Sequence, residues 1–201
     1  MKLIAINLVC IALLAQAAAA ATRDYPVSEC DRRASNPEDQ DIIAPAVPRS
    51  EMDLPKAIAA CEAETGKHPD NARAHYQLAR SLFYDGQTRR AAAEMKRAAD
   101  EGYRQAQFVY GLMIDRGRPD MPKDPCIVER YWLKSARAGR QAARVSYVRH
   151  ALRGKFDGCD VQATPAEMKQ FLEAALADAG DYYERLLIED LSGELAARSK
   201  R

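Results

Sequence analysis

The sequence predicts an all-α fold built from antiparallel helix pairs. Helical periodicity of apolar residues runs from about Leu54 onward, and no alternating strand pattern is sustained along the chain. Three segments also end alike, at Gly102, Gly139 and Gly180, which are 37 and 41 residues apart. Such a period is typical of two-helix repeats. We therefore expect about three helical hairpins plus partial terminal units, in a helical repeat domain over residues 51–197.

The first 21 residues have the pattern of an export signal. Lys2 supplies a positive start, residues 3–14 form an apolar run, and mostly small residues follow up to Ala21. A transmembrane anchor would need about 18–20 apolar residues, which is more than this run provides. We expect cleavage near Ala20 or Ala21, and a mature chain that is periplasmic or secreted and keeps no transmembrane anchor.

The charge balance argues against a general nucleic-acid binder. The chain has 30 Lys plus Arg and 29 Asp plus Glu, and removal of Lys2 with the signal leaves 29 of each. Domains that bind nucleic acid show a strongly basic balance instead. The 47% hydrophobic and 29% charged residues also argue against wholesale disorder and against a multi-span membrane protein.

Residues 22–50 differ in composition from the rest of the chain. They contain Pro26, Pro37, Pro45 and Pro48 among serine, asparagine and aspartate residues. This composition predicts an extended N-terminal arm that lies on the first repeat, with a disordered linker as the alternative. At the other end, residues 198–201 form a basic tail that we expect to be frayed.

Export makes the cysteines candidates for disulfide bonds. Cys10 would leave with the signal, so four remain, an even number in an oxidising compartment. Three pairings are possible, and Cys30–Cys61 with Cys126–Cys159 is favoured because each pair joins neighbouring segments of a linear array. No two of the four have the C-x-x-C spacing of a zinc site, so we expect no metal.

The ends of the helices are marked by capping residues. Each of the three repeated glycines stands where a C-terminal cap needs left-handed backbone. Asp124-Pro125 predicts an N-cap followed by a first-turn proline, and Thr164 with Glu167 predicts a capping box. Turn-forming segments that separate the two helices of each hairpin lie at 85–87, 116–119 and 154–158.

Two stretches of this region resemble known repeats. Residues 74–82, with Gly86 and Ala91, resemble a tetratricopeptide repeat. The next unit resembles the longer Sel-one-like variant in its small, turn-forming and aromatic positions: 106–112, Gly117, Asp124, Tyr131-Trp132 and 136–139. The resemblance covers about Leu54 to Gly193 and weakens in the third unit, where Val148 replaces the usual glycine. It implies a short right-handed solenoid whose first helices line a concave face.

The resemblance also implies which positions face this groove. Counted from the aligned alanines of each unit, they are rich in arginine and tyrosine: Arg73, Tyr76, Arg80, Tyr84, Gln105, Arg116, Arg149 and Arg153. Arginine pairs bidentately with carboxylates and tyrosine gives rigid contact area, a mixture suited to recognition. The alternative is a solvated face whose arginines pair with acids that the sequence does not place.

No catalytic motif accompanies the groove. The sequence contains no G-x-S-x-G elbow, S-x-x-K, H-E-x-x-H, P-loop or G-x-G-x-x-G. We expect a non-enzymatic exported adaptor, without a cofactor, that binds an acidic or extended segment of a protein partner. A binder of cell-wall or other anionic glycan is the alternative. A weak hydrolase, as the resemblance to cysteine-rich members of the family suggests, is disfavoured because the repeats lack a regular cysteine pair.

Overall fold

A computed structural model describes residues 25–117, 121, 123–160 and 162–199. The predicted signal peptide over residues 1–21 and the last two residues of the predicted tail lie outside this part. The regular elements within it are helices, which confirms the predicted all-α class. They are α1 (Glu29–Ala34), the 3-10 helix η1 (Arg49–Glu51), α2 (Leu54–Lys67), α3 (Ala72–Tyr84), α4 (Thr88–Asp100), α5 (Arg104–Arg116), α6 (Pro125–Arg137), α7 (Gln141–Leu152), α8 (Pro165–Ala177) and α9 (Tyr182–Arg198).

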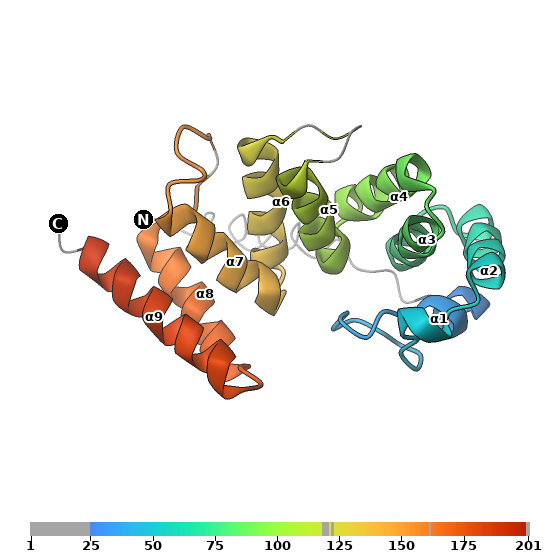
Figure 1. Ribbon diagram of the computed structural model, residues 1–201, viewed down its shortest axis with the longest axis horizontal. Coiled ribbons are helices and arrows are strands. Elements are labelled where there is room, and N and C mark those ends of the chain that lie inside the picture. The colour runs from blue at the N-terminus through green and yellow to red at the C-terminus, as the bar shows by residue number, and fades with distance from the viewer. Residues whose placement is uncertain (1–24, 118–120, 122, 161, 200–201) are drawn as a thin grey trace, which may run out of the picture.

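From α2 onward the helices pack in chain order. Each helix contacts mainly the helices before and after it, and the most extensive contacts join α3 to α4 and α5 to α6. Figure 1 shows a curved row from α2 to α9, with α1 lying beside the α2 and α3 end. The row consists of the hairpins α3–α4, α5–α6 and α7–α8, with α2 and α9 at its ends, as the repeat period predicts.

Most of the predicted helix ends are confirmed. The Asp124 carboxylate accepts hydrogen bonds from two amides in the first turn of α6, and Thr164 accepts one from the Glu167 amide. The reciprocal half of the capping box was predicted wrongly. The Glu167 carboxylate accepts from Arg137 of α6 at 2.7 Å instead, because an arginine on the neighbouring helix offers a charged donor.

The prediction for the glycines is confirmed at two positions out of three. Gly102 and Gly139 have left-handed backbone, with φ of 94° and 90°. Gly180 does not, so that prediction was wrong. Helix α8 has already ended at Ala177, and the Gly180 amide donates to the Glu184 carboxylate at 2.9 Å in the connection to α9.

Close approach of neighbouring units holds the array together. Trp132 is 2% exposed and contacts Phe108 of α5 and His150 of α7. Gly111 makes room for it, since a Cβ atom there would lie 2.5 Å from the indole ring. Burial of one such large side chain contributes about 1.5–3 kcal/mol. A single hairpin buries few of them, so stability depends on stacking.

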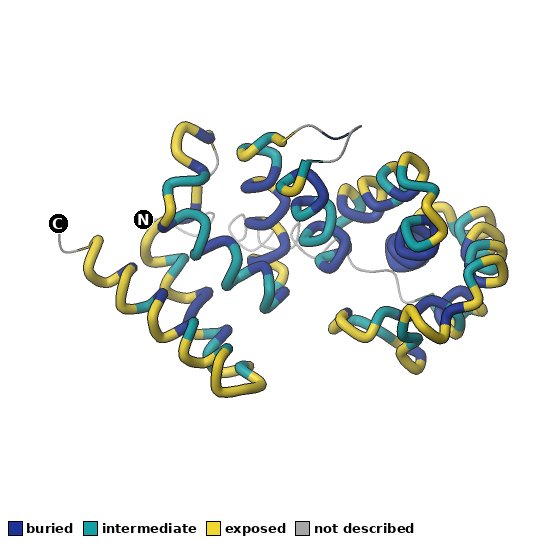
Figure 2. The backbone as a smooth tube through the Cα atoms, in the orientation of Figure 1, coloured by how far each residue is buried: buried dark blue, intermediate teal, exposed yellow. Residues whose placement is uncertain are grey.

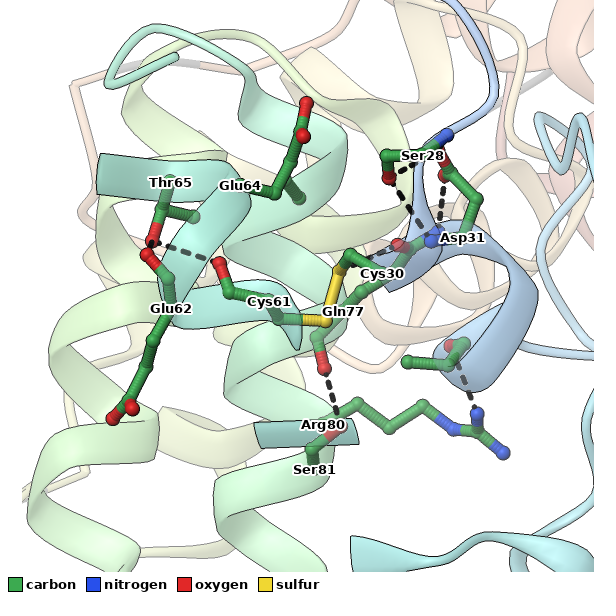
Figure 3. The surroundings of a disulfide bond; sticks show 12 residues. Ser28, Cys30, Asp31, Cys61, Glu62, Glu64, Thr65, Gln77, Arg80 and Ser81 are labelled. Carbon is green, nitrogen blue, oxygen red and sulfur yellow. Dashed lines mark hydrogen bonds between the residues drawn. A yellow bond between two sulfur atoms is a disulfide. The ribbon is translucent and has the colours of Figure 1, made fainter. Parts of the chain in front are cut away.

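Both favoured disulfides are present. Cys30–Cys61 joins α1 to α2, with both residues fully buried (Figure 3). Cys126–Cys159 joins the start of α6 to the loop after α7. The first disulfide therefore fixes the N-terminal arm to the repeat array.

The composition of the arm had suggested an extended segment, but part of the arm is helical. It contains the six-residue helix α1, which begins with a reciprocal capping box between Ser28 and Asp31. After α1 the chain runs without helix until η1, and a hydrogen bond from the Val47 amide to the Ser35 carbonyl closes this segment into a loop. We call residues 35–47 the arm loop.

Candidate functional site

The arm covers the face of α3 that was predicted to line the groove. Every residue of α3 from Ala72 to Leu82 is buried, and Figure 2 shows this helix as a dark core within the α1–α4 end of the molecule. A groove-lining helix would leave one face open to solvent. Here that face contacts α1 and the arm loop.

A buried ion pair anchors the arm at α1. The Arg73 guanidinium donates to both carboxylate oxygens of Asp31, at 2.7 and 3.3 Å, and the two side chains are 7% and 2% exposed. The same carboxylate accepts from the Gln77 amide at 2.9 Å and from the Ser28 hydroxyl at 2.7 Å. These bonds satisfy an acid that would otherwise be costly to bury.

The next two groove positions, Tyr76 and Arg80, form hydrogen bonds with neutral groups of the arm. Arg80 is 6% exposed and donates to three backbone carbonyls, those of Ala34, Ser35 and Val47. Figure 3 shows its side chain reaching toward the end of α1. The Tyr76 hydroxyl accepts from Asn36 of the arm loop and from Gln105 of α5.

The tip of the arm loop crosses to the second and third units. Asp39 accepts from the Tyr103 hydroxyl at 2.6 Å, and Asp41 pairs with Arg104 of α5. Arg140, at the start of α7, donates to the Glu38 carbonyl at 2.8 Å and to Gln105. One loop is therefore bound to α3, α5 and α7 at once.

The pKa values of the two buried acids of the arm are shifted in opposite directions. Burial raises the pKa of Asp39, and the hydrogen bond from Tyr103 only partly offsets this. Burial acts in the same direction on Asp31, but the hydrogen bonds from Arg73 and Ser28 outweigh it and hold the pKa of Asp31 below its usual value. Burial, with Asp39 nearby, raises the pKa of the Tyr76 hydroxyl to about 12. Tyr76 therefore stays protonated at neutral pH.

The structure divides the predicted groove positions into two sets of four. The covered half contacts the arm or is buried beneath it: Arg73, Tyr76, Arg80 and Gln105. The open half lies at the C-terminal ends of α3, α5 and α7: Tyr84, Arg116, Arg149 and Arg153.

The open half carries three arginines that form no ion pair within the described part of the chain. Arg116 and Arg153 are exposed and Arg149 is half-buried, and none of the three has a hydrogen bond or ion pair with the described residues. The neighbouring Asp115 is paired with Lys155 and does not neutralise them. Tyr84 lies at the border of the two halves. It is half-buried and contacts Arg49 of the arm and Arg80 of the covered half, whose guanidinium carbons lie 5.0 and 5.2 Å from its ring centre.

Several residues of the site were not anticipated from the sequence. They bind the arm across the groove: Asp31, Asp39, Asp41, Arg104 and Arg140. One signal in the sequence could have indicated them. The chain has almost no net charge although the predicted groove is rich in arginine, so acids must lie elsewhere in the chain. For Arg73 this acid is Asp31, so the alternative of pairing with unplaced acids holds at that position.

The described residues contain no group of three or more His, Cys, Asp or Glu placed to hold a metal ion. In the same part of the chain, no helix has both the length and the apolarity to cross a membrane.

No protein-family model matches the sequence, and no curated protein matches it. Among solved structures, the chain is similar to a Sel1 repeat protein from Oxalobacter formigenes, with a TM-score of 0.52 and 21% sequence identity. The similarity covers 64% of this chain and 96% of that chain. The chain has the fold of a Sel1 repeat protein. At this identity the likeness concerns the fold, and the Sel1-type stack of helical hairpins agrees with the resemblance read from the sequence.

Proposed function

We propose that this Sel1-type protein is a non-enzymatic exported adaptor that binds an acidic or extended segment of a partner protein on the open half of the concave face. The observation that carries the proposal is the arm. It is a proline-rich segment that brings Asp31, Asp39 and Asp41 against α3 and the start of α5, where its carboxylates and backbone carbonyls accept hydrogen bonds from arginines and a tyrosine. A face that binds one such segment of its own chain has the chemistry to bind a second.

The open half offers the same chemistry to a partner. Arg116, Arg149 and Arg153 can each form bidentate hydrogen bonds with a carboxylate. Half-buried Phe108 and Leu112 lie on α5, the helix that carries Arg116, and supply apolar contact area. The arm loop already ties the three first helices together, so the surface is pre-organised and less entropy is lost on binding.

Export is supported by the residue pattern at the N-terminus and by the cysteines. Together, the two disulfides use all four cysteines that would remain after cleavage of the signal. Disulfides persist in oxidising compartments, so the pairing is compatible with a periplasmic or secreted protein.

A matched pair of charge reversals tests the proposal. The mature chain, residues 22–201 with disulfides intact, is immobilised and crosslinked to native envelope extract. One variant carries Arg149→Glu with Arg153→Glu. The control carries Arg130→Glu with Lys134→Glu, which are exposed on α6, have the same four-residue spacing and change the charge equally.

We expect one protein to be retained by the native chain and the control and lost with the groove variant, while circular dichroism shows equal helicity in all three. Equal capture by all three would refute the groove assignment. Retention of wall or polysaccharide fragments without protein would favour the glycan alternative instead.

A further inference from the structure

A pocket of about 210 Å³ opens between α3, α4 and α5. Its wall is apolar and includes Met95 of α4 with Val109, Leu112 and Met113 of α5. Small-molecule sites usually measure about 300–1,000 Å³. This pocket is therefore suited to a group of side-chain size rather than to a large ligand.

The polar residues that line this pocket are cationic or neutral. Arg80 and Arg116 contribute two guanidinium groups, Asn36 and two tyrosines contribute neutral groups, and no Asp or Glu is among the described residues that line it. Arg49 adds a third cation next to the lining residue Tyr84. Among the residues that the structure describes, the charge around the pocket is thus positive.

Arg80 is an unusual group to find in this wall. It is 6% exposed, its three hydrogen-bond acceptors are carbonyls, and it lies against the Tyr84 ring, but it has no ion pair with an acid among the described residues. Its buried Nε has no hydrogen-bond partner among the described residues. A buried arginine is normally paired with an acid, so an anion at the mouth of the pocket would complete this arrangement.

We propose that the pocket binds an apolar group of side-chain size that carries a carboxylate. The aliphatic or aromatic part would fill the space between Met95, Val109 and Met113, and the carboxylate would lie toward Arg116 and Arg80. A free short-chain acid and the carboxyl-terminal residue of a peptide share this chemistry. The pocket shares Arg116 and Leu112 with the open half, but it is not lined by Arg149 or Arg153. The adaptor test changes only these last two arginines, so the two proposals can fail separately.

Titrations of the ¹⁵N-labelled mature chain test the proposal. The probes are 4-methylpentanoate, its neutral amide, a pentapeptide that ends in leucine with a free carboxylate, and the same peptide amidated. Amide shifts of α3, α4 and α5 report binding. We expect the acids to saturate with dissociation constants of about millimolar or tighter, and the neutral amides to bind about tenfold more weakly because a charge-assisted hydrogen bond is lost.

Three variants locate the site. Arg116→Gln should weaken binding of the acids about tenfold, whereas Arg130→Gln, an exposed arginine on α6, should not change it. Val109→Phe should fill the pocket and abolish binding of acids and amides alike. Equal affinity for acid and amide, or equal behaviour of the Arg116 and Arg130 variants, would overturn the proposal. Tighter binding of the free-carboxylate peptide than of 4-methylpentanoate identifies a peptide terminus as the ligand, and the reverse order identifies a free acid.

Discussion

The covered and open halves of the predicted groove positions contain similar residues in opposite states. In the covered half, Arg73 and Arg80 are buried and bound to the arm. In the open half, Arg116 and Arg153 are exposed and have no ion pair with the described residues. The helices that carry them belong to the same kind of repeat, so the difference arises from the arm. A segment outside the repeats therefore decides which of the predicted groove positions are structural and which stay exposed.

This contrast has an energetic consequence. A buried guanidinium that loses its acceptors leaves an uncompensated charge, whereas an exposed one remains solvated. We therefore expect substitutions in the covered half to lower the stability of the fold. Substitutions in the open half should affect binding and leave stability unchanged.

The largest effect is expected at the ion pair that anchors the arm. Asp31→Asn should lower the free energy of unfolding by about 3–5 kcal/mol, because Arg73 would remain buried without a counter-charge. Urea denaturation at pH 7 measures it. Glu29→Gln removes an exposed acid from the same helix and should leave the midpoint unchanged. Equal midpoints for the two variants would mean that the ion pair does not hold the arm.

The disulfides allow a comparison between two loops of similar length. Cys30→Ser with Cys61→Ser removes a bridge across 31 residues, and Cys126→Ser with Cys159→Ser removes one across 33. Each double variant should lose about 2–5 kcal/mol, since the chain-entropy effect depends on loop length.

Hydrogen exchange then separates the two disulfide variants. Only loss of Cys30–Cys61 should increase exchange in α1, the arm loop and the covered face of α3, because this bridge ties the arm to α2. Similar exchange in both variants would show that the noncovalent contacts alone fix the arm.

A smaller effect distinguishes one arginine in each half. Arg80→Gln should cost about 1–3 kcal/mol, because two buried carbonyls and one part-buried carbonyl lose a donor that glutamine is too short to replace. Arg116→Gln should stay within about 0.5 kcal/mol of the native chain. Thermal and urea unfolding of the two variants give this comparison directly, and equal losses would remove the distinction between the halves.

The sequence predicted the parts of the fold that depend on local patterns. Helical periodicity and caps such as Asp124 depend on residues that are close together in the sequence. The hairpins and their order could therefore be derived. The errors at Gly180 and Glu167 occurred where a neighbouring side chain competed for the same hydrogen bonds. The disulfide pairing followed from the linear order of the units.

The course of the arm could not be predicted in this way. Its contacts join residues far apart in the chain, up to 102 positions between Glu38 and Arg140, and it has no periodicity to mark which face it covers. Composition indicated an extended arm near the first repeat, but not that Asp39 would be buried against the second. Only the side-chain placement reveals that part of the groove is already occupied.

The smallest effect concerns that buried acid and its dependence on pH. Burial raises the pKa of Asp39 in the folded chain. The protonated form therefore contributes stability below the unfolded pKa of about 3.9. This contribution is lost as the pH rises through the pKa of the folded state. Asp39→Asn cannot ionise and keeps an oxygen that accepts from Tyr103. We expect its stability to stay within about 1 kcal/mol of the native chain and to improve relative to it between about pH 4 and pH 7.

Asp31 gives the opposite dependence and so provides the control. Its pKa is lowered by the bonds from Arg73 and Ser28 despite burial, so its contribution is present above its unfolded pKa and is lost as the pH falls through the folded value. The deficit of Asp31→Asn relative to the native chain should therefore shrink in acid, while that of Asp39→Asn should grow. Urea midpoints across this range measure both. If the two curves ran in parallel, Asp39 would be an ionised partner of the arginines around it, and the tip of the arm would be bound by charge in the same way as its base.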